Sequence, residues 1–277
     1  MKLVQLRSGA AVPALGQGTW MMGEDARHAR AEADALRLGL DLGMTLIDTA
    51  EMYASGGAEL IVADAIQGRR EQVFLVSKAL PSNASHERLP AACNASLKRL
   101  RTDHIDLYLL HWRGRVQLAE TVEAMVRLVE SGKVGAWGVS NFDADDMQEL
   151  VGIAGGERTA TNQILYNLRR RGPEFDLMPW LAAHQVPTMA YSPVEQGGLV
   201  DDPHLAVIAG RHDATPAQVA LAWTMRSGDV IAIPKASRLE HVSQNRMAAD
   251  LELTQQDLAE IDALFPPSKH KKPLEMI

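Results

Sequence analysis

Short apolar segments alternate with longer amphipathic segments along almost the whole chain. Brief apolar runs bounded by turn residues predict buried strands, and apolar residues recurring every three or four positions predict helices. We expect strands at 16–20, 45–47, 73–77, 105–110, 134–139, 160–164, 188–191 and 230–233. We expect helices at 27–42, 58–67, 86–100, 118–130, 144–151, 173–184, 215–227 and 239–247. Uninterrupted alternation of this kind is typical of a parallel sheet covered by helices.

Eight strand–helix pairs in a chain of 277 residues predict a closed (β/α)8 barrel, the TIM barrel. Residues 3–6 and 11–13 predict a β-hairpin before the barrel, and residues 254–264 predict an extra helix after it. We therefore expect an α/β fold with a single domain spanning residues 1–277. An open doubly wound sheet is disfavoured, because the glycines of 16–23 lack the spacing of a dinucleotide-binding fingerprint.

The composition narrows the classes of partner. A formal charge of −7 disfavours nucleic acid, and we interpret the basic runs 169–171 and 269–272 as solvated surface. The single cysteine, Cys93, excludes an internal disulfide and suits a reducing compartment. We find no signal peptide, no apolar run of the ~20 residues that span a membrane, and no His/Cys spacing typical of a metal site. These features favour a cytoplasmic protein without a membrane partner.

Polar residues follow three of the predicted strands where an apolar run does not need them. Asp48, Lys78 and His111 each come directly after such a strand, and Tyr53 lies on the loop that follows Asp48. Because the carboxyl ends of barrel strands meet at one face, we expect the four side chains to converge there. Glu51, in the same loop as Tyr53, is interpreted as a solvated residue.

This group of side chains suits the reduction of a carbonyl. A phenol has an ordinary pKa near 10, and we expect the Lys78 ammonium to lower the pKa of Tyr53 so that it serves as a proton donor. Asp48 would hold Lys78 in place, and His111 would orient a carbonyl oxygen. None of these groups donates a hydride, so a hydride-carrying cofactor is required. Each residue taken alone has a commoner structural explanation, as a cap, a packing residue or a surface charge.

Six segments resemble the signature segments of the aldo-keto reductases. They are 47–53 (IDTAEMY), 76–78 (VSK), 107–112 (LYLLHW), 138–142 (GVSNF), 190–193 (AYSP) and 233–236 (IPKA). Within that family the chain is most similar to bacterial methylglyoxal reductases and 2,5-diketo-D-gluconate reductases. The resemblance implies a TIM barrel that binds NADPH without a Rossmann fold and reduces aldehydes and ketones to alcohols. It also implies a catalytic tetrad of Asp48, Tyr53, Lys78 and His111, with Tyr53 as the general acid.

The same resemblance assigns residues to the cofactor. Ser140, Asn141 and Gln163 match residues that bind the nicotinamide carboxamide, and Tyr191 matches the ring that stacks on the nicotinamide. His241 stands where the family often has arginine beside the 2′-phosphate, so we expect NADPH as the cofactor and some acceptance of NADH. The full set expected at the cofactor is Thr19, Trp20, Asp48, Ser140, Asn141, Gln163, Tyr191, Ser192, Val194, Gln196, Lys235, Ala236, Ser237, Arg238, His241, Gln244 and Asn245.

The substrate site is expected beside the tetrad. Trp20 and Trp112 fall where the family lines its cleft, together with Tyr53 and His111. The loop 112–116 and the tail after residue 267 are short, which predicts an open pocket with broad acceptance of small carbonyl compounds such as methylglyoxal. We expect the protein to act as a monomer.

Two other functions remain open from the residues. A barrel aldolase would use Lys78 as a Schiff base, which requires a desolvated lysine with a lowered pKa, and borohydride trapping would detect it. A cofactor-bound redox sensor or regulatory subunit would bind the nicotinamide without oxidising it in the presence of a carbonyl compound.

Overall fold

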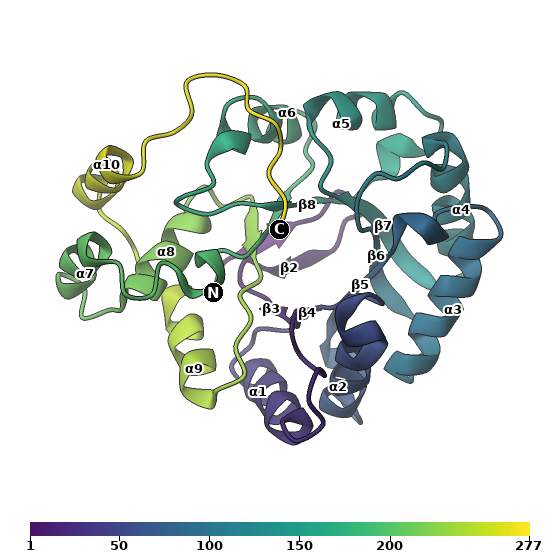
Figure 1. Ribbon diagram of the computed structural model, residues 1–277, viewed down its shortest axis with the longest axis horizontal. Coiled ribbons are helices and arrows are strands. Elements are labelled where there is room, and N and C mark those ends of the chain that lie inside the picture. Colours follow the sequence, from purple (N-terminus) through teal and green to yellow (C-terminus); the bar gives the residue numbers. More distant parts are fainter.

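The computed structural model describes all 277 residues and contains a sheet of eight parallel strands whose order in space follows their order in the chain. The strands are β3 (Gln17–Gly18), β4 (Leu46–Asp48), β5 (Phe74–Ala79), β6 (Ile105–Leu110), β7 (Val134–Ser140), β8 (Asn162–Leu165), β9 (Thr188–Tyr191) and β10 (Val230–Ala232). The Gly16 N–H donates to the Ala232 carbonyl at 2.8 Å, and the Gly18 N–H donates to Pro234 at 3.0 Å. These bonds join the first and last strands, so the sheet closes into a ring (Figure 1).

Helices surround this ring (Figure 1). They are α1 (Ala29–Asp41), α2 (Gly57–Ile66), α3 (Arg88–Leu100), α4 (Leu118–Glu130), α5 (Ala144–Val151), α6 (Leu177–Ala183), α7 (Pro203–Gly210), α8 (Pro216–Thr224), α9 (Leu239–Ala248) and α10 (Gln255–Leu264). The eight expected parallel strands are confirmed, and α10 lies where a further helix was expected. None of these helices is both long enough and apolar enough to cross a membrane.

The structure differs most from the expected elements in two places. Helix α6 begins at Leu177, because a 3-10 turn at Gly172–Glu174 occupies the start of the helix expected at 173–184. Helix α7 was not expected at all. It begins with the Asp202 side chain accepting the N–H groups of the first turn and with a proline at its start, which is a common way to begin a helix.

Apolar side chains fill the ring at its amino end. The hairpin of β1 (Leu3–Gln5) and β2 (Ala11–Pro13) confirms the expected one, and it packs buried Val4 and Val12 against the apolar interior of the ring. Inside the ring lie buried aliphatic side chains such as Val76, Leu107 and Ile231. Polar side chains such as Asp48 and Lys78 gather at the opposite, carboxyl end of the ring, which is where barrel sites are found.

The interpretation of the basic run 169–171 as solvated surface is wrong for Arg171, whereas Arg169 is exposed as expected. The side chain of Arg171 is only 6% exposed, and its guanidinium bonds the Glu174 carboxylate, the Asp262 carboxylate and the Phe265 carbonyl. The cation joins the loop after β8 to the end of α10, contacts that a count of charges along the sequence does not reveal.

We predict that Arg171→Met lowers the free energy of unfolding by about 2 kcal/mol, because the largely buried Glu174 carboxylate loses one of its two cations and keeps only Arg226. Urea denaturation measures the change. Arg30→Met is the control, since the Arg30 side chain is 95% exposed and its change should be below about 0.5 kcal/mol. Equal effects of the two substitutions would contradict the structural role of Arg171.

Candidate active site

The four polar residues singled out from the sequence converge at the carboxyl end of the ring. Asp48 ends β4, Lys78 lies near the end of β5, and His111 follows β6. Lys78 Nζ lies 2.7 Å from Asp48 Oδ2 and 3.0 Å from Tyr53 Oη. The Tyr53 and His111 rings meet edge to face with centroids 5.7 Å apart. The expected convergence of these side chains is thus present in the structure.

The hydrogen bonds of Lys78 determine where the tyrosine proton points. Lys78 is fully buried, and Nζ donates to Asp48 Oδ2, to the Thr49 carbonyl at 2.9 Å and to Tyr53 Oη. An ammonium group only donates, so Tyr53 Oη accepts this bond and keeps its own O–H free for another acceptor. A phenol held in this way presents its proton to whatever binds at the mouth of the ring.

The pKa of Tyr53 differs from the expectation. Burial raises the pKa of this phenol and the Lys78 ammonium opposes the rise, but the net shift is upward, not downward. Burial alone would lower the pKa of Lys78, and the charges of Asp48 and Tyr53 more than compensate, which keeps it raised. At neutral pH the site therefore contains a protonated phenol beside an ammonium group.

Asp48 is held on both of its oxygens. Burial raises the pKa of this carboxyl, while Lys78 on Oδ2 and the side-chain amide of Gln163 on Oδ1, at 2.7 Å, oppose the rise. Its backbone carbonyl accepts the Thr19 hydroxyl at 3.0 Å. Gln163, assigned from the sequence to the cofactor, thus also orients the aspartate, a contact that the sequence did not reveal.

His111 is a neutral imidazole. Burial lowers its pKa to about 3, and the nearby Lys78 charge acts in the same direction. Its Nδ1 is buried without a hydrogen-bond partner. The Trp112 ring lies 5.0 Å from the His111 ring between centroids, whereas Trp20 is exposed at the rim. The uncharged ring can share a hydrogen bond with a substrate oxygen without adding a second cation beside Lys78.

The residues matched to the nicotinamide carboxamide lie on neighbouring strand ends. The Ser140 hydroxyl donates to the Gln163 carbonyl at 2.8 Å. Asn141, in a left-handed conformation with φ 58°, donates to the His111 carbonyl and accepts the Tyr191 hydroxyl at 2.9 Å. These bonds connect the ends of β6, β7, β8 and β9 and fix the side chains around one opening.

The residues matched to the adenosine end lie around the start of α9. Lys235, Arg238 and His241 are exposed, and none of them forms an ion pair with an acidic side chain. No side chain caps this helix start, so its first N–H groups have no side-chain partner. Ser237 accepts from Lys235 Nζ at 3.4 Å. The remaining assigned residues here are Ala236, Gln244 and Asn245.

The loop after β9 is connected to the tail of the chain. This loop contains Ser192, Val194 and Gln196, all three assigned to the cofactor from the sequence. The Arg170 guanidinium bonds Glu195 of the loop at 2.7 Å and Glu275 of the tail at 2.6 Å.

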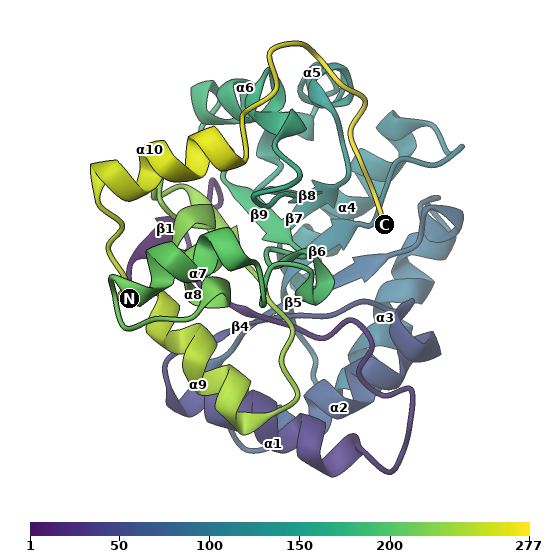
Figure 2. The same cartoon turned by 60° about the vertical axis from the view of Figure 1, so that its left-hand side comes forward.

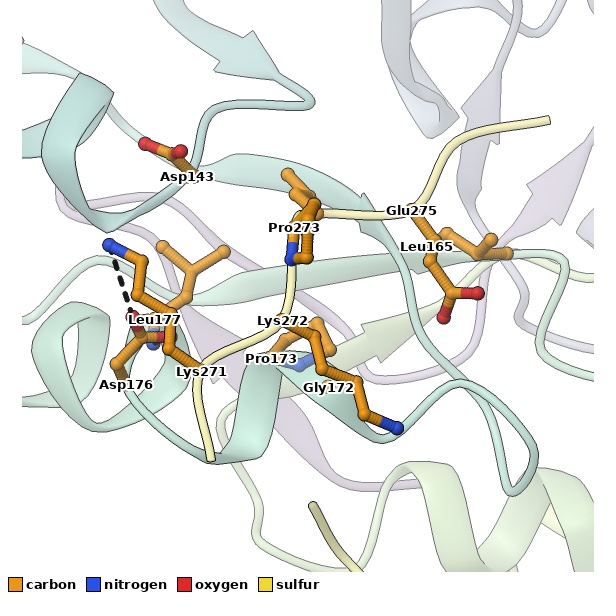
Figure 3. Close-up of a pocket in the computed structure, with 11 residues that line it drawn as sticks. Asp143, Leu165, Gly172, Pro173, Asp176, Leu177, Lys271, Lys272, Pro273 and Glu275 are labelled. Carbon is orange, nitrogen blue, oxygen red and sulfur yellow. Dashed lines mark hydrogen bonds and ion pairs between the residues drawn. The ribbon is translucent and has the colours of Figure 1, made fainter. Parts of the chain in front are cut away.

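The tail crosses the carboxyl end of the ring. Figure 2 shows it arching from α10 past α6 and α5 and back toward the centre. Lys271 pairs with Asp145 at 2.8 Å and with Asp176 at 3.6 Å, and Figure 3 shows the tail lying against Gly172 and Pro173 above a small hollow. The open pocket expected from the short tail stays a prediction, although this tail does reach the mouth.

Glu51 is not the solvated loop residue that we expected. It is half-buried, and its Oε1 accepts the Leu80 N–H at 2.7 Å and the Asn83 side-chain amide at 2.8 Å. Glu51 lies about 30 residues before Leu80 and Asn83, so the sequence does not reveal these contacts. No group of three or more His, Cys, Asp or Glu side chains is arranged to hold a metal ion.

Comparisons with known proteins agree on one family. The aldo/keto reductase family model matches residues 14–265. The chain is 50% identical to methylglyoxal reductase YeaE of Escherichia coli strain K12, over all of this chain and 99% of that protein. It is 33% identical to glyoxal reductase of Bacillus subtilis strain 168, over 94% of this chain and 92% of that protein. A crystal structure of an aldo/keto reductase from Klebsiella pneumoniae with NADP and acetate has a TM-score of 0.98 and 50% identity, covering all of this chain and 99% of that one.

We predict that the His111 imidazole does not titrate between about pH 5 and pH 9, because its pKa of about 3 keeps it neutral there. Histidine Cε1–H resonances followed by NMR measure this, and the His111→Gln spectrum identifies the resonance. A titration midpoint of about pH 6.5, the ordinary value for histidine, would show that the imidazole is solvated rather than buried.

Proposed function

The chain belongs to the aldo/keto reductase family, and we propose that it reduces small aldehydes and ketones to alcohols with NADPH. In this proposal the hydride comes from the cofactor and the proton comes from Tyr53. The observation that carries it is the buried Lys78 ammonium, 3.0 Å from the Tyr53 hydroxyl, beside a neutral His111.

Two features support NADPH as the cofactor. The exposed cations Lys235 and Arg238 lie at an uncapped helix start, where free N–H groups and positive charge favour a phosphate. The Klebsiella relative was crystallised with NADP. His241 stands where the family often has arginine and lacks the bidentate guanidinium of that residue. We therefore expect some acceptance of NADH, although Lys235 and Arg238 still favour NADPH. When bound, the cofactor supplies the hydride.

The side chains of the tetrad have distinct roles in this proposal. The substrate carbonyl oxygen accepts the free O–H of Tyr53 and a ring N–H of His111, which places it at the carboxyl end of the ring. As negative charge develops on that oxygen, the Tyr53 proton moves to it. Lys78 stabilises the phenolate that remains, and Asp48 holds Lys78 in position.

The substrate class proposed is a small carbonyl compound such as methylglyoxal. Relatives at 50% and 33% identity are named methylglyoxal reductase and glyoxal reductase. Trp112, against the His111 ring, and Trp20, at the rim, would enclose a small molecule by shape. Because all four tetrad residues come from one chain, we propose that the protein acts as a monomer with a single domain. We also propose that it is cytoplasmic.

The two alternatives are less well supported. A Schiff-base aldolase needs a neutral lysine, whereas the pKa of Lys78 is raised by Asp48 and Tyr53 against the effect of burial. A regulatory subunit or redox sensor would not need a tyrosine whose proton is held free by a lysine, as Tyr53 is here.

We predict that Tyr53→Phe lowers kcat for methylglyoxal reduction by at least about 100-fold, because it removes the transferred proton. Quenching of protein fluorescence measures the Kd for NADPH. This Kd should stay within about twofold of that of the unchanged protein, since the fold and the cofactor residues remain. Activity that survives the substitution would exclude Tyr53 as the proton donor.

We predict that Lys235→Ala raises KM for NADPH by about tenfold and KM for NADH by less than about twofold, because only NADPH has the 2′-phosphate. Lys98→Ala, an exposed lysine on α3, is the control and should change neither constant. If the two cofactors are affected equally, the 2′-phosphate is bound elsewhere.

A further inference from the structure

The contact between Tyr53 and Lys78 joins a loop to a neighbouring strand. Backbone pairing of β4 with β5 extends to Asp48 opposite Val76, so Tyr53 lies well beyond the regular register. The phenol on this loop keeps its distance of 3.0 Å from the ammonium group on β5 only if other bonds hold the loop to the end of that strand.

The turn at Tyr53 has a strained backbone. Ala54 and Ser55 have φ of 48° and 53°, and Gly56 has φ of 92°. The left-handed region costs non-glycine residues about 1 kcal/mol or more each, so two successive residues there persist only where surrounding contacts require them. Released from those contacts, this turn would relax and carry the Tyr53 ring with it.

Glu51 supplies contacts at the amino end of this turn. Its Oε1 accepts the Leu80 N–H at 2.7 Å and the Asn83 amide at 2.8 Å, while its own N–H points to the Lys78 carbonyl at 3.4 Å. Glu51 lies two residues before Tyr53, and Leu80 lies two residues after Lys78. One carboxylate thus connects the loop that bears the phenol to the segment that directly follows the strand bearing the ammonium group.

A different pair supports the other end of the turn. Glu59 is completely buried behind the ring and bonds the Ser77 hydroxyl and the Arg99 guanidinium, and the Arg99 side chain packs closely against Gly56. That pair lies under the turn and does not reach the loop after Lys78. The backbone bond from the Thr49 N–H to the Val76 carbonyl joins the two segments before Lys78. Beyond Lys78, the side chain of Glu51 supplies the bonds between them.

We propose that Glu51 is a positioning residue for the proposed reduction. By accepting the Leu80 and Asn83 N–H groups, the Glu51 bridge keeps the Tyr53 hydroxyl in register with Lys78. This inference rests on the proposed function, because it explains how the proton donor is held for that reaction. It requires an acceptor oxygen at this position and not a negative charge.

The test compares Glu51→Ala with Glu51→Gln. The alanine variant loses the acceptor and should lower kcat about tenfold to 100-fold, as a misplaced reacting group does, with KM for NADPH within about twofold. The glutamine variant keeps an acceptor oxygen and should restore kcat to within about threefold. If glutamine fails as alanine does, or if alanine leaves kcat unchanged, the Glu51 bridge is overturned.

Glu120→Ala is the matched control. Glu120 is also half-buried and accepts a loop N–H, that of His86, at 2.9 Å, but it contacts neither tetrad loop. It should reduce stability much as Glu51→Ala does and leave kcat unchanged. A fall in kcat of equal size in both variants would show that general destabilisation, not positioning, is responsible.

A second measurement does not depend on turnover. The chain has four tyrosines, so 13Cζ-labelled tyrosine gives a spectrum in which Tyr53→Phe identifies the Tyr53 signal. The midpoint of its pH titration should move by about half a pH unit or more in Glu51→Ala and stay in place in Glu51→Gln and Glu120→Ala, because it depends on the Lys78 contact. An unmoved midpoint in Glu51→Ala overturns the inference. Absence of carbonyl reduction by the unchanged protein overturns the proposed function instead.

Discussion

The site depends on one buried ammonium group. Lys78 is enclosed by the ring, and burial of an unpaired charge there would be very costly, so each of its donors needs an acceptor. Asp48, the Thr49 carbonyl and Tyr53 supply them. The phenol thereby has to accept a bond from Lys78, which directs its own proton outward. The orientation of the reacting proton follows from satisfying a buried cation.

The fold permits a buried ammonium group because the two ends of the ring differ: the amino end is apolar and the carboxyl end is polar. The hairpin and aliphatic side chains such as Leu107 and Ile231 close the amino end of the ring, so water does not reach Lys78 from below. At the carboxyl end, side chains from neighbouring strands bond one another, as Gln163 does with Asp48 and Asn141 with Tyr191. A preorganised set of donors in a dry site is what stabilises charge developing on a carbonyl oxygen.

Much of this was predictable from the sequence, and the failures have identifiable causes. Strand–helix alternation gave the eight strands, polar residues after strands gave the tetrad positions, and the resemblance to the aldo-keto reductases is confirmed. The predicted direction of the Tyr53 pKa shift is wrong. The shift is a balance between burial, which raises the pKa, and the Lys78 charge, which lowers it, and the extent of burial is known only from the three-dimensional structure. The sequence does not reveal that Arg171 is buried and Glu51 half-buried, because their partners Asp262 and Leu80 lie far away along the chain. Local pattern reports which face a residue occupies but not which distant group it meets.

Arg170 holds together two segments that are distant in the sequence. Its guanidinium bonds Glu195 in the loop after β9 and Glu275 in the tail, two segments that approach the mouth from different sides. One cation therefore ties the loop after β9 to the tail. The Arg170 side chain is 34% exposed and that of Glu275 is 45% exposed, so dissolved electrolyte screens their attraction and loosens the hold of the tail on this loop.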